Sequence, residues 1–97
     1  MSGYTVLVEA LHDLAKRYVW WQPPEVTLAR RDHFLCQLMA LATAEDMRLA
    51  RDVLGDDAFR EALRNAPPGV IDARSWNFWH LFFFGQPPPP LPQRPLP

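Results

Sequence analysis

The sequence predicts an all-α fold, a compact bundle of four to five short helices followed by a proline-rich C-terminal tail. Apolar residues recur at spacings of three and four in several segments, which is the period of an amphipathic helix. No segment alternates apolar and polar residues as a half-buried strand would. Seven of the twelve residues from 86 to 97 are proline, which favours an extended polyproline II conformation. We therefore expect a helical domain over residues 1–85 and an extended tail over residues 86–97.

Composition narrows the class of protein. The 97 residues correspond to one domain. The 10 basic and 11 acidic side chains are interspersed, so no basic arm or patch for nucleic acid or an anionic membrane is expected. A single cysteine excludes an intrachain disulfide, and the N-terminus has no signal-peptide pattern. No apolar run approaches the ~20 residues that span a bilayer, so we expect a cytoplasmic protein without a membrane span.

The first half of the chain contains two predicted helices and a turn. Residues 5–18 carry one apolar stripe, formed by Leu7, Leu11, Leu14 and Tyr18. Trp20 and Trp21 end this helix, because prolines follow at positions 23 and 24. Residues 24–29 are expected to form a helical turn, in which a proline is tolerated at the start. Residues 31–42 form the second helix, with one apolar face made by Phe34, Leu35, Leu38, Met39 and Ala42.

The next two helices are delimited by capping residues. Thr43 is expected to cap the third helix, which runs to about Leu54 with Met47, Ala50 and Val53 on its apolar side. Gly55 suits a left-handed end to that helix. Asp56 or Asp57 is expected to cap the fourth helix, which the prolines and glycine at 67–69 terminate. Its apolar stripe consists of Phe59, Ala62, Leu63 and Ala66.

The last helix contains more aromatic area than a small core needs. Asp72 is expected to cap it and Gly85 to end it. Six of the twelve residues from 74 to 85 have large aromatic rings. Helical spacing predicts a core face made of Trp76, Trp79, His80 and Phe83. Phe78 and Phe82 are an i, i+4 pair on a different side, and an uncovered pair would form an adhesive surface.

The proline-rich tail is one candidate to cover those rings, and a protein partner is the other. Aromatic grooves are the usual receptors of proline-rich segments. Residues 89–94 also match the P-x-x-P-x-Arg pattern of SH3 ligands. A homodimer formed through the exposed aromatic side chains would cover them in the same way as a different protein partner would. The residues that we expect to bind a partner are Trp76, Phe78, Trp79, Phe82, Leu91 and Arg94.

No catalytic, cofactor or metal site is predicted. His12, His33 and His80 fall on three different predicted helices, without the i, i+4 spacing of a helical metal site. Cys36 lies in an apolar run without an identifiable base, so we expect a buried thiol rather than a nucleophile. The paired acids at 45–46 and 56–57 lie at helix starts, where capping explains them. We therefore expect a protein that is not an enzyme.

A DNA-binding regulator is the alternative function, because the third and fourth helices invite a helix-turn-helix interpretation. Four arginines would form its basic side: Arg48, Arg51, Arg60 and Arg64. The fourth helix opens with Asp56 and Asp57, which would meet the phosphates of the duplex with the wrong charge. For that reason a protein partner is preferred to nucleic acid.

Several short motifs carry a resemblance to a known family. They are Trp20–Glu25, Gln37–Ala40, Thr43–Asp46, Leu54–Asp57, Asn65–Gly69, Arg74–Trp76 and Trp79–His80. These motifs resemble small uncharacterised bacterial proteins that are commonly encoded beside nucleotidyltransferases of the abortive-infection toxin type. The similarity spans about residues 20–92 and is most specific from 65 to 80. It implies an antitoxin or accessory partner of a nucleotidyltransferase in a toxin–antitoxin or phage-defence pair, without catalytic residues of its own.

Overall fold

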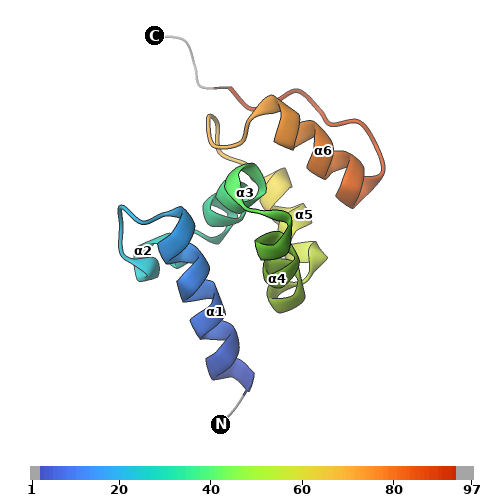
Figure 1. Ribbon diagram of the computed structural model, residues 1–97. Coiled ribbons are helices and arrows are strands. Elements are labelled where there is room, and N and C mark those ends of the chain that lie inside the picture. The colour runs from blue at the N-terminus through green and yellow to red at the C-terminus, as the bar shows by residue number, and fades with distance from the viewer. Residues whose placement is uncertain (1–2, 94–97) are drawn as a thin grey trace.

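The computed structural model describes residues 3–93, which form six α-helices and no strand (Figure 1). The helices are α1 (Gly3–Tyr18), α2 (Pro24–Ala29), α3 (Arg31–Leu41), α4 (Ala44–Leu54), α5 (Asp56–Arg64) and α6 (Ala73–Phe84). The all-α prediction is confirmed. The described residues contain one helix more than expected, because residues 24–29 form a helix of their own. Pro24 occupies its first turn, where a missing amide hydrogen costs nothing.

The centre of the bundle is α3, which contacts α1, α2, α5 and α6 (Figure 1). Its buried side chains point in several directions around the helix rather than along one stripe, which is the pattern of a helix covered on most sides. They are Phe34, Leu35, Cys36, Leu38 and Met39. The helix ends at Leu41, one residue before the predicted end, and Ala42 is its C-cap.

The predicted stripe of α1 is buried only toward the C-terminal end of the helix. Leu14 is buried, whereas Leu11 and Tyr18 are half-buried and Leu7 is exposed. Figure 1 shows the reason, because the first turns of α1 extend beyond the other helices. The buried Val19, immediately after the helix, completes the contact with the core.

Asp46 joins the start of α4 to the end of α1. Its carboxylate accepts hydrogen bonds from the Tyr18 hydroxyl and from Nη1 of Arg17, the latter at 2.8 and 3.0 Å. The Tyr18 hydroxyl first, and then Arg17, lower the pKa of Asp46 below its ordinary value. The Asp46 amide in turn donates to the Thr43 side chain at 3.1 Å. The predicted Thr43 cap is therefore confirmed.

The junction between α4 and α5 differs from the prediction. Gly55 is at once the C-cap of α4 and the N-cap of α5, with φ 84° and ψ 155°. Its φ is positive, but its backbone is extended rather than left-handed helical, so the predicted left-handed cap is wrong. Neither aspartate caps α5; both lie in its first turn. Asp56 instead accepts two hydrogen bonds from Arg51, at 2.8 and 3.0 Å, and Asp57 pairs with Arg60 at 2.6 Å.

Both predicted ends of α6 are confirmed. The Asp72 side chain accepts a hydrogen bond from the Ser75 amide at 3.1 Å, which satisfies one of the free donors of the first turn. Gly85 has φ 68° and ψ 18°, the left-handed conformation that ends many helices, and its amide donates to the Leu81 carbonyl at 3.0 Å. These two caps set the ends of α6.

Candidate functional site

The inner face of α6 belongs to the core, as predicted. Trp76, His80 and Phe83 are buried. Phe83 stacks on Phe59 of α5, with ring centroids 5.8 Å apart and planes within 11°. Trp79, which was expected in the same face, is only half-buried, because it lies between the inner face and the next side of the helix.

Phe78, Trp79 and Phe82 form what we call the outer aromatic face. Phe78 and Phe82 stack with their centroids 6.2 Å apart and are 55% and 48% exposed. Trp79 meets both rings edge to face, at 4.8 Å from Phe78 and 5.3 Å from Phe82. Its indole Nε1–H donates to the main-chain carbonyl of Met39 at 2.8 Å, which fixes the ring against α3. The outer aromatic face is thus a surface of rings held in place from below.

The chain after α6 covers the opposite side of the helix. It turns back at Gly85 and runs along α6 toward the start of the helix (Figure 1). The Trp76 Nε1–H donates to the Pro89 carbonyl at 2.8 Å, and Leu91 packs half-buried against the core. This segment, residues 87–92, has no helix or strand and is called the proline strap below. It leaves the outer aromatic face uncovered.

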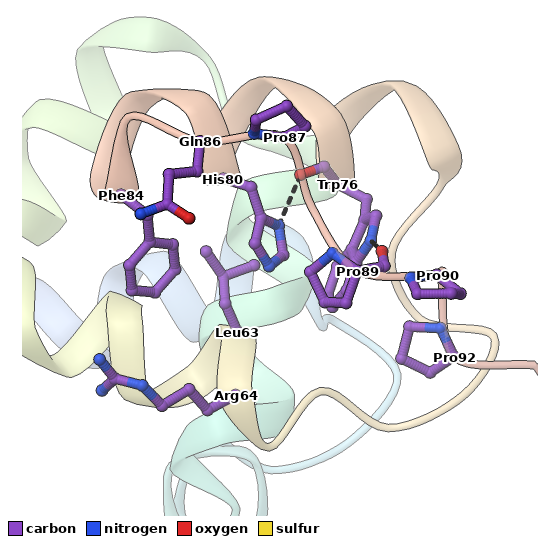
Figure 2. Close-up of a pocket in the computed structure, with 10 residues that line it drawn as sticks. All are labelled: Leu63, Arg64, Trp76, His80, Phe84, Gln86, Pro87, Pro89, Pro90 and Pro92. Carbon is purple, nitrogen blue, oxygen red and sulfur yellow. Dashed lines mark hydrogen bonds between the residues drawn. The ribbon is translucent and has the colours of Figure 1, made fainter.

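A cavity of about 440 Å³ lies between the proline strap and the helices (Figure 2). The His80 ring points into it between Phe84 and Pro89, and Leu63 of α5 forms its floor. His80 Nδ1 lies 2.8 Å from the Trp76 carbonyl. A carbonyl only accepts hydrogen bonds, so Nδ1 carries a hydrogen and Nε2 is the nitrogen left to interact in the cavity.

The predicted partner-binding residues therefore separate into three groups. Phe78 and Phe82 are exposed, with Trp79 half-buried beneath them. Trp76 and Leu91 contact the chain's own core instead. Arg94 lies outside the described residues.

Three of the four arginines of the DNA-binding alternative lie against the end of α6. The guanidinium of Arg51 lies over the Phe82 ring, 4.5 Å from its centroid, and that of Arg64 lies 5.3 Å from the centroid of Phe84. Arg60 donates to the Phe83 carbonyl at 3.0 Å, one of the free carbonyls of the last turn. Arg51 and Arg60 are half-buried in these contacts, whereas Arg64 remains exposed. Arg48 is exposed, and the DNA-binding surface stays a prediction.

Cys36 has the environment of a structural thiol. It is fully buried, and its Sγ lies 3.4 Å from the Ala62 carbonyl, to which the S–H donates. Burial, and then the negative charge of Asp32, raise its pKa to about 12. A nucleophile requires the opposite shift, so this cysteine is unsuited to attack a substrate at neutral pH.

Two further properties concern the described part of the chain as a whole. Residues 3–93 contain no group of three or more His, Cys, Asp or Glu side chains arranged to hold a metal ion. None of the helices described is both long enough and apolar enough to cross a membrane.

Sequence reasoning missed one exposed aromatic pair. Trp20 and Trp21, interpreted only as the end of α1, are 76% and 57% exposed and meet edge to face at 5.8 Å. They lie in the connection from α1 to α2, away from α6 (Figure 1). The signal was present in the prolines that follow, because they force the chain out of the helix before either ring reaches the core.

The chain was also compared with known proteins. No family model, no curated protein and no solved structure matches it.

Proposed function

We propose that the protein is a non-enzymatic interaction module that binds a protein partner through the outer aromatic face. The observation that carries this proposal is the pair of stacked rings, Phe78 and Phe82, left half-exposed while the proline strap covers the other side of α6. A whole aromatic side chain buries ~150–250 Å², and about half of that area remains to be removed from water for each of these half-exposed rings. The free energy gained at ~25 cal/mol per Å² is then several kcal/mol for the pair.

The rings are preorganised for binding. Trp79 is held by its hydrogen bond to Met39 and supports both exposed rings edge to face. Arg51 lies over Phe82, and two hydrogen bonds to Asp56 fix its guanidinium. Little side-chain entropy remains to be lost on association. Aromatic residues and arginine are also the residue types that dominate binding energy at protein interfaces.

A nucleotidyltransferase encoded beside this protein is the partner that we propose. The support is the resemblance of the motifs between residues 20 and 92 to proteins with such neighbours. In this role the protein acts as an antitoxin or accessory subunit, and binding rather than chemistry carries the effect. A partner with an apolar surface bearing acidic residues at its edge would complement the rings and Arg51 together.

Co-expression with the adjacent nucleotidyltransferase tests the proposal. The tagged wild-type protein should retain the partner through purification and restore the growth of cells that express it. Phe78→Asp should weaken the complex at least about tenfold, because it places a charge at the centre of an apolar contact. The matched control is Leu49→Asp, at a leucine that is 42% exposed on α4.

Each result has a definite meaning. If the wild-type proteins neither associate nor affect growth, the nucleotidyltransferase is not the partner. If the Phe78→Asp and Leu49→Asp variants both bind the partner as tightly as the wild-type protein does, the partner does not use the outer aromatic face. Light scattering of the isolated protein measures whether it forms a homodimer. If it does, and if Phe78→Asp converts the dimer to a monomer, then a second copy of the chain occupies the outer aromatic face.

A further inference from the structure

The side of α6 beneath the proline strap has the features of a receptor for proline-rich chains. Trp76, His80 and Phe84 follow one another at intervals of four residues, so their rings form a row along the helix. The Trp76 and His80 centroids are 4.1 Å apart, and those of His80 and Phe84 are 5.5 Å apart. Leu63 lies below the row (Figure 2). We call these four residues the strap groove.

Aromatic-lined grooves recognise extended proline-rich segments in several families of binding domains. Proline rings pack on aromatic side chains, and the main-chain carbonyls of the segment remain free to accept hydrogen bonds. The contact between the Trp76 Nε1–H and the Pro89 carbonyl, at 2.8 Å, is of this kind. The protein thus binds its own proline-rich segment in a manner typical of a ligand.

The strap is held by one side-chain hydrogen bond and by apolar contacts of its leucine and prolines. Trp76–Pro89 is its one side-chain hydrogen bond to the helices among the described residues, and Leu91 is its half-buried apolar anchor. A proline-rich segment is extended before it binds, so ordering it again on another surface costs little entropy. Release of the strap would therefore require the replacement of one hydrogen bond, of the Leu91 contact and of the packing of the half-buried Pro88 and Pro92.

The strap also leaves part of the groove unfilled. The cavity of about 440 Å³ remains between His80, Phe84 and the strap, with Arg64 at its edge (Figure 2). This volume opens to solvent between the strap and α5, so a larger side chain can enter it without displacing the core. A different segment with a bulkier side chain over His80 would bury more apolar surface than the strap does.

We propose that the strap groove is a binding site for a proline-rich segment of a partner protein, and that the chain's own strap occupies this site until such a segment displaces it. The ligand is an extended Pro-Pro-Leu-Pro type of sequence, with a carbonyl that accepts from Trp76 and a leucine that takes the place of Leu91. This site goes beyond the outer aromatic face and does not depend on it, because Phe78 and Phe82 project from the other side of α6.

Peptide titration followed by nuclear magnetic resonance tests the proposal on the full chain. The probe is a capped peptide with the sequence of residues 86–93, and the control peptide has Asp in place of its leucine. Leu91→Asp loosens the strap without altering the groove, and Leu49→Asp is the matched control. The Trp76 indole N–H signal, assigned with Trp76→Phe, reports occupancy of the groove.

In Leu91→Asp the probe should move the Trp76 indole signal toward its wild-type position. Wild-type protein and Leu49→Asp should bind the probe at least about tenfold more weakly, because the tethered strap competes at an effective concentration on the order of millimolar. The control peptide should leave the signal unmoved. The double variant Leu91→Asp, Trp76→Phe should lose most of the affinity, since it lacks the indole donor; its binding is followed by the backbone amide signals of His80 and Phe84.

Any one of four results would overturn the proposal. One is a folded Leu91→Asp protein whose Trp76 signal does not respond to the probe at millimolar concentration. Another is equal binding of the probe and the control peptide, or binding at Phe78 and Phe82 instead. If Leu91→Asp loses its dispersed spectrum, Pro89→Gly serves as the loosened chain, because it keeps the carbonyl acceptor. Loss of the folded spectrum in both variants would show that the strap is part of the core and not a displaceable ligand.

Discussion

The indole N–H of Trp79 on α6 donates to the main-chain carbonyl of Met39 on α3, with the two atoms 2.8 Å apart. Met39 lies in the last turn of α3, which ends at Leu41. The carbonyls of a last turn have no partner within their own helix. Trp79 therefore satisfies a carbonyl that the end of α3 leaves free, and the same contact fixes the base of the outer aromatic face.

Trp79→Phe should lower the free energy of unfolding by ~1–3 kcal/mol, because it removes the donor and leaves the Met39 carbonyl unpaired. Urea denaturation measures the change, and an unaltered slope with denaturant would show that the folded state keeps its compactness. Trp21→Phe is the control, since this side chain is 57% exposed. It should change stability by less than ~0.5 kcal/mol. Equal losses in the two variants would contradict the assigned role.

Asp46→Asn should destabilise the protein by ~1–3 kcal/mol at neutral pH, because the buried side chain loses its charge-assisted bonds to Tyr18 and Arg17. The pKa of Asp46 is lowered by folding, chiefly by the Tyr18 hydroxyl. Its stabilisation is therefore fully present above the unfolded value of about 4 and is lost as the pH falls through the folded value.

Thermal unfolding measured from neutral pH down to about pH 3 checks this sign. The wild-type protein should lose more stability on acidification than Asp46→Asn. Asp13→Asn, at an exposed carboxylate of α1, should retain the wild-type pH profile. A wild-type profile in Asp46→Asn would mean that another carboxylate dominates acid unfolding.

Asp72→Ala should cost ~1 kcal/mol, because the Ser75 amide loses its cap. Asp57→Ala provides the comparison, since Asp57 lies in the first turn of α5 with a side chain that is 97% exposed and does not cap the helix. Its loss should stay below ~0.5 kcal/mol. Chemical denaturation of the two variants side by side checks the difference, and a larger loss in Asp57→Ala would overturn the capping assignment.

Cys36 should react slowly with a thiol reagent in the native protein and rapidly in denaturant. With a pKa of about 12 the thiol is almost entirely protonated at neutral pH, and the side chain is fully buried. Trp79→Phe should accelerate the native reaction about tenfold for each ~1.4 kcal/mol of stability lost, because opening of the fold precedes modification. Rapid stoichiometric labelling of the wild-type protein would contradict this environment.

The features that the sequence predicted correctly are local in the chain. The caps at Thr43 and Asp72 each bond to an amide three residues later, so a short pattern contains both partners. The two faces of α6 follow from helical spacing except at Trp79, which was expected in the core face and lies half-buried beneath Phe78 and Phe82. The same local reasoning misplaced the caps of α5, because Gly55 serves both helices and Arg51 draws the Asp56 carboxylate away from the helix start.

The features that the sequence did not predict depend on contacts between distant residues. Which side of α6 the tail covers is set by Trp76 and Pro89 together with the packing of Leu91, and proline content alone does not specify it. The position of Arg51 over Phe82 brings together residues from α4 and α6. Such pairs are decided when the helices pack, and a pattern of spacings contains no information about them.

The four tryptophans make this protein a two-site optical reporter. Trp76 and Trp79 donate their indole hydrogens to carbonyls on either side of α6, whereas Trp20 and Trp21 are exposed in the α1–α2 connection. A soluble quencher should therefore first reduce the fluorescence of Trp20 and Trp21, whose emission is red-shifted because they are exposed to water. The blue-shifted fluorescence that remains comes from Trp76 and Trp79 on α6. It can report both binding at the outer aromatic face and displacement of the proline strap without an added label.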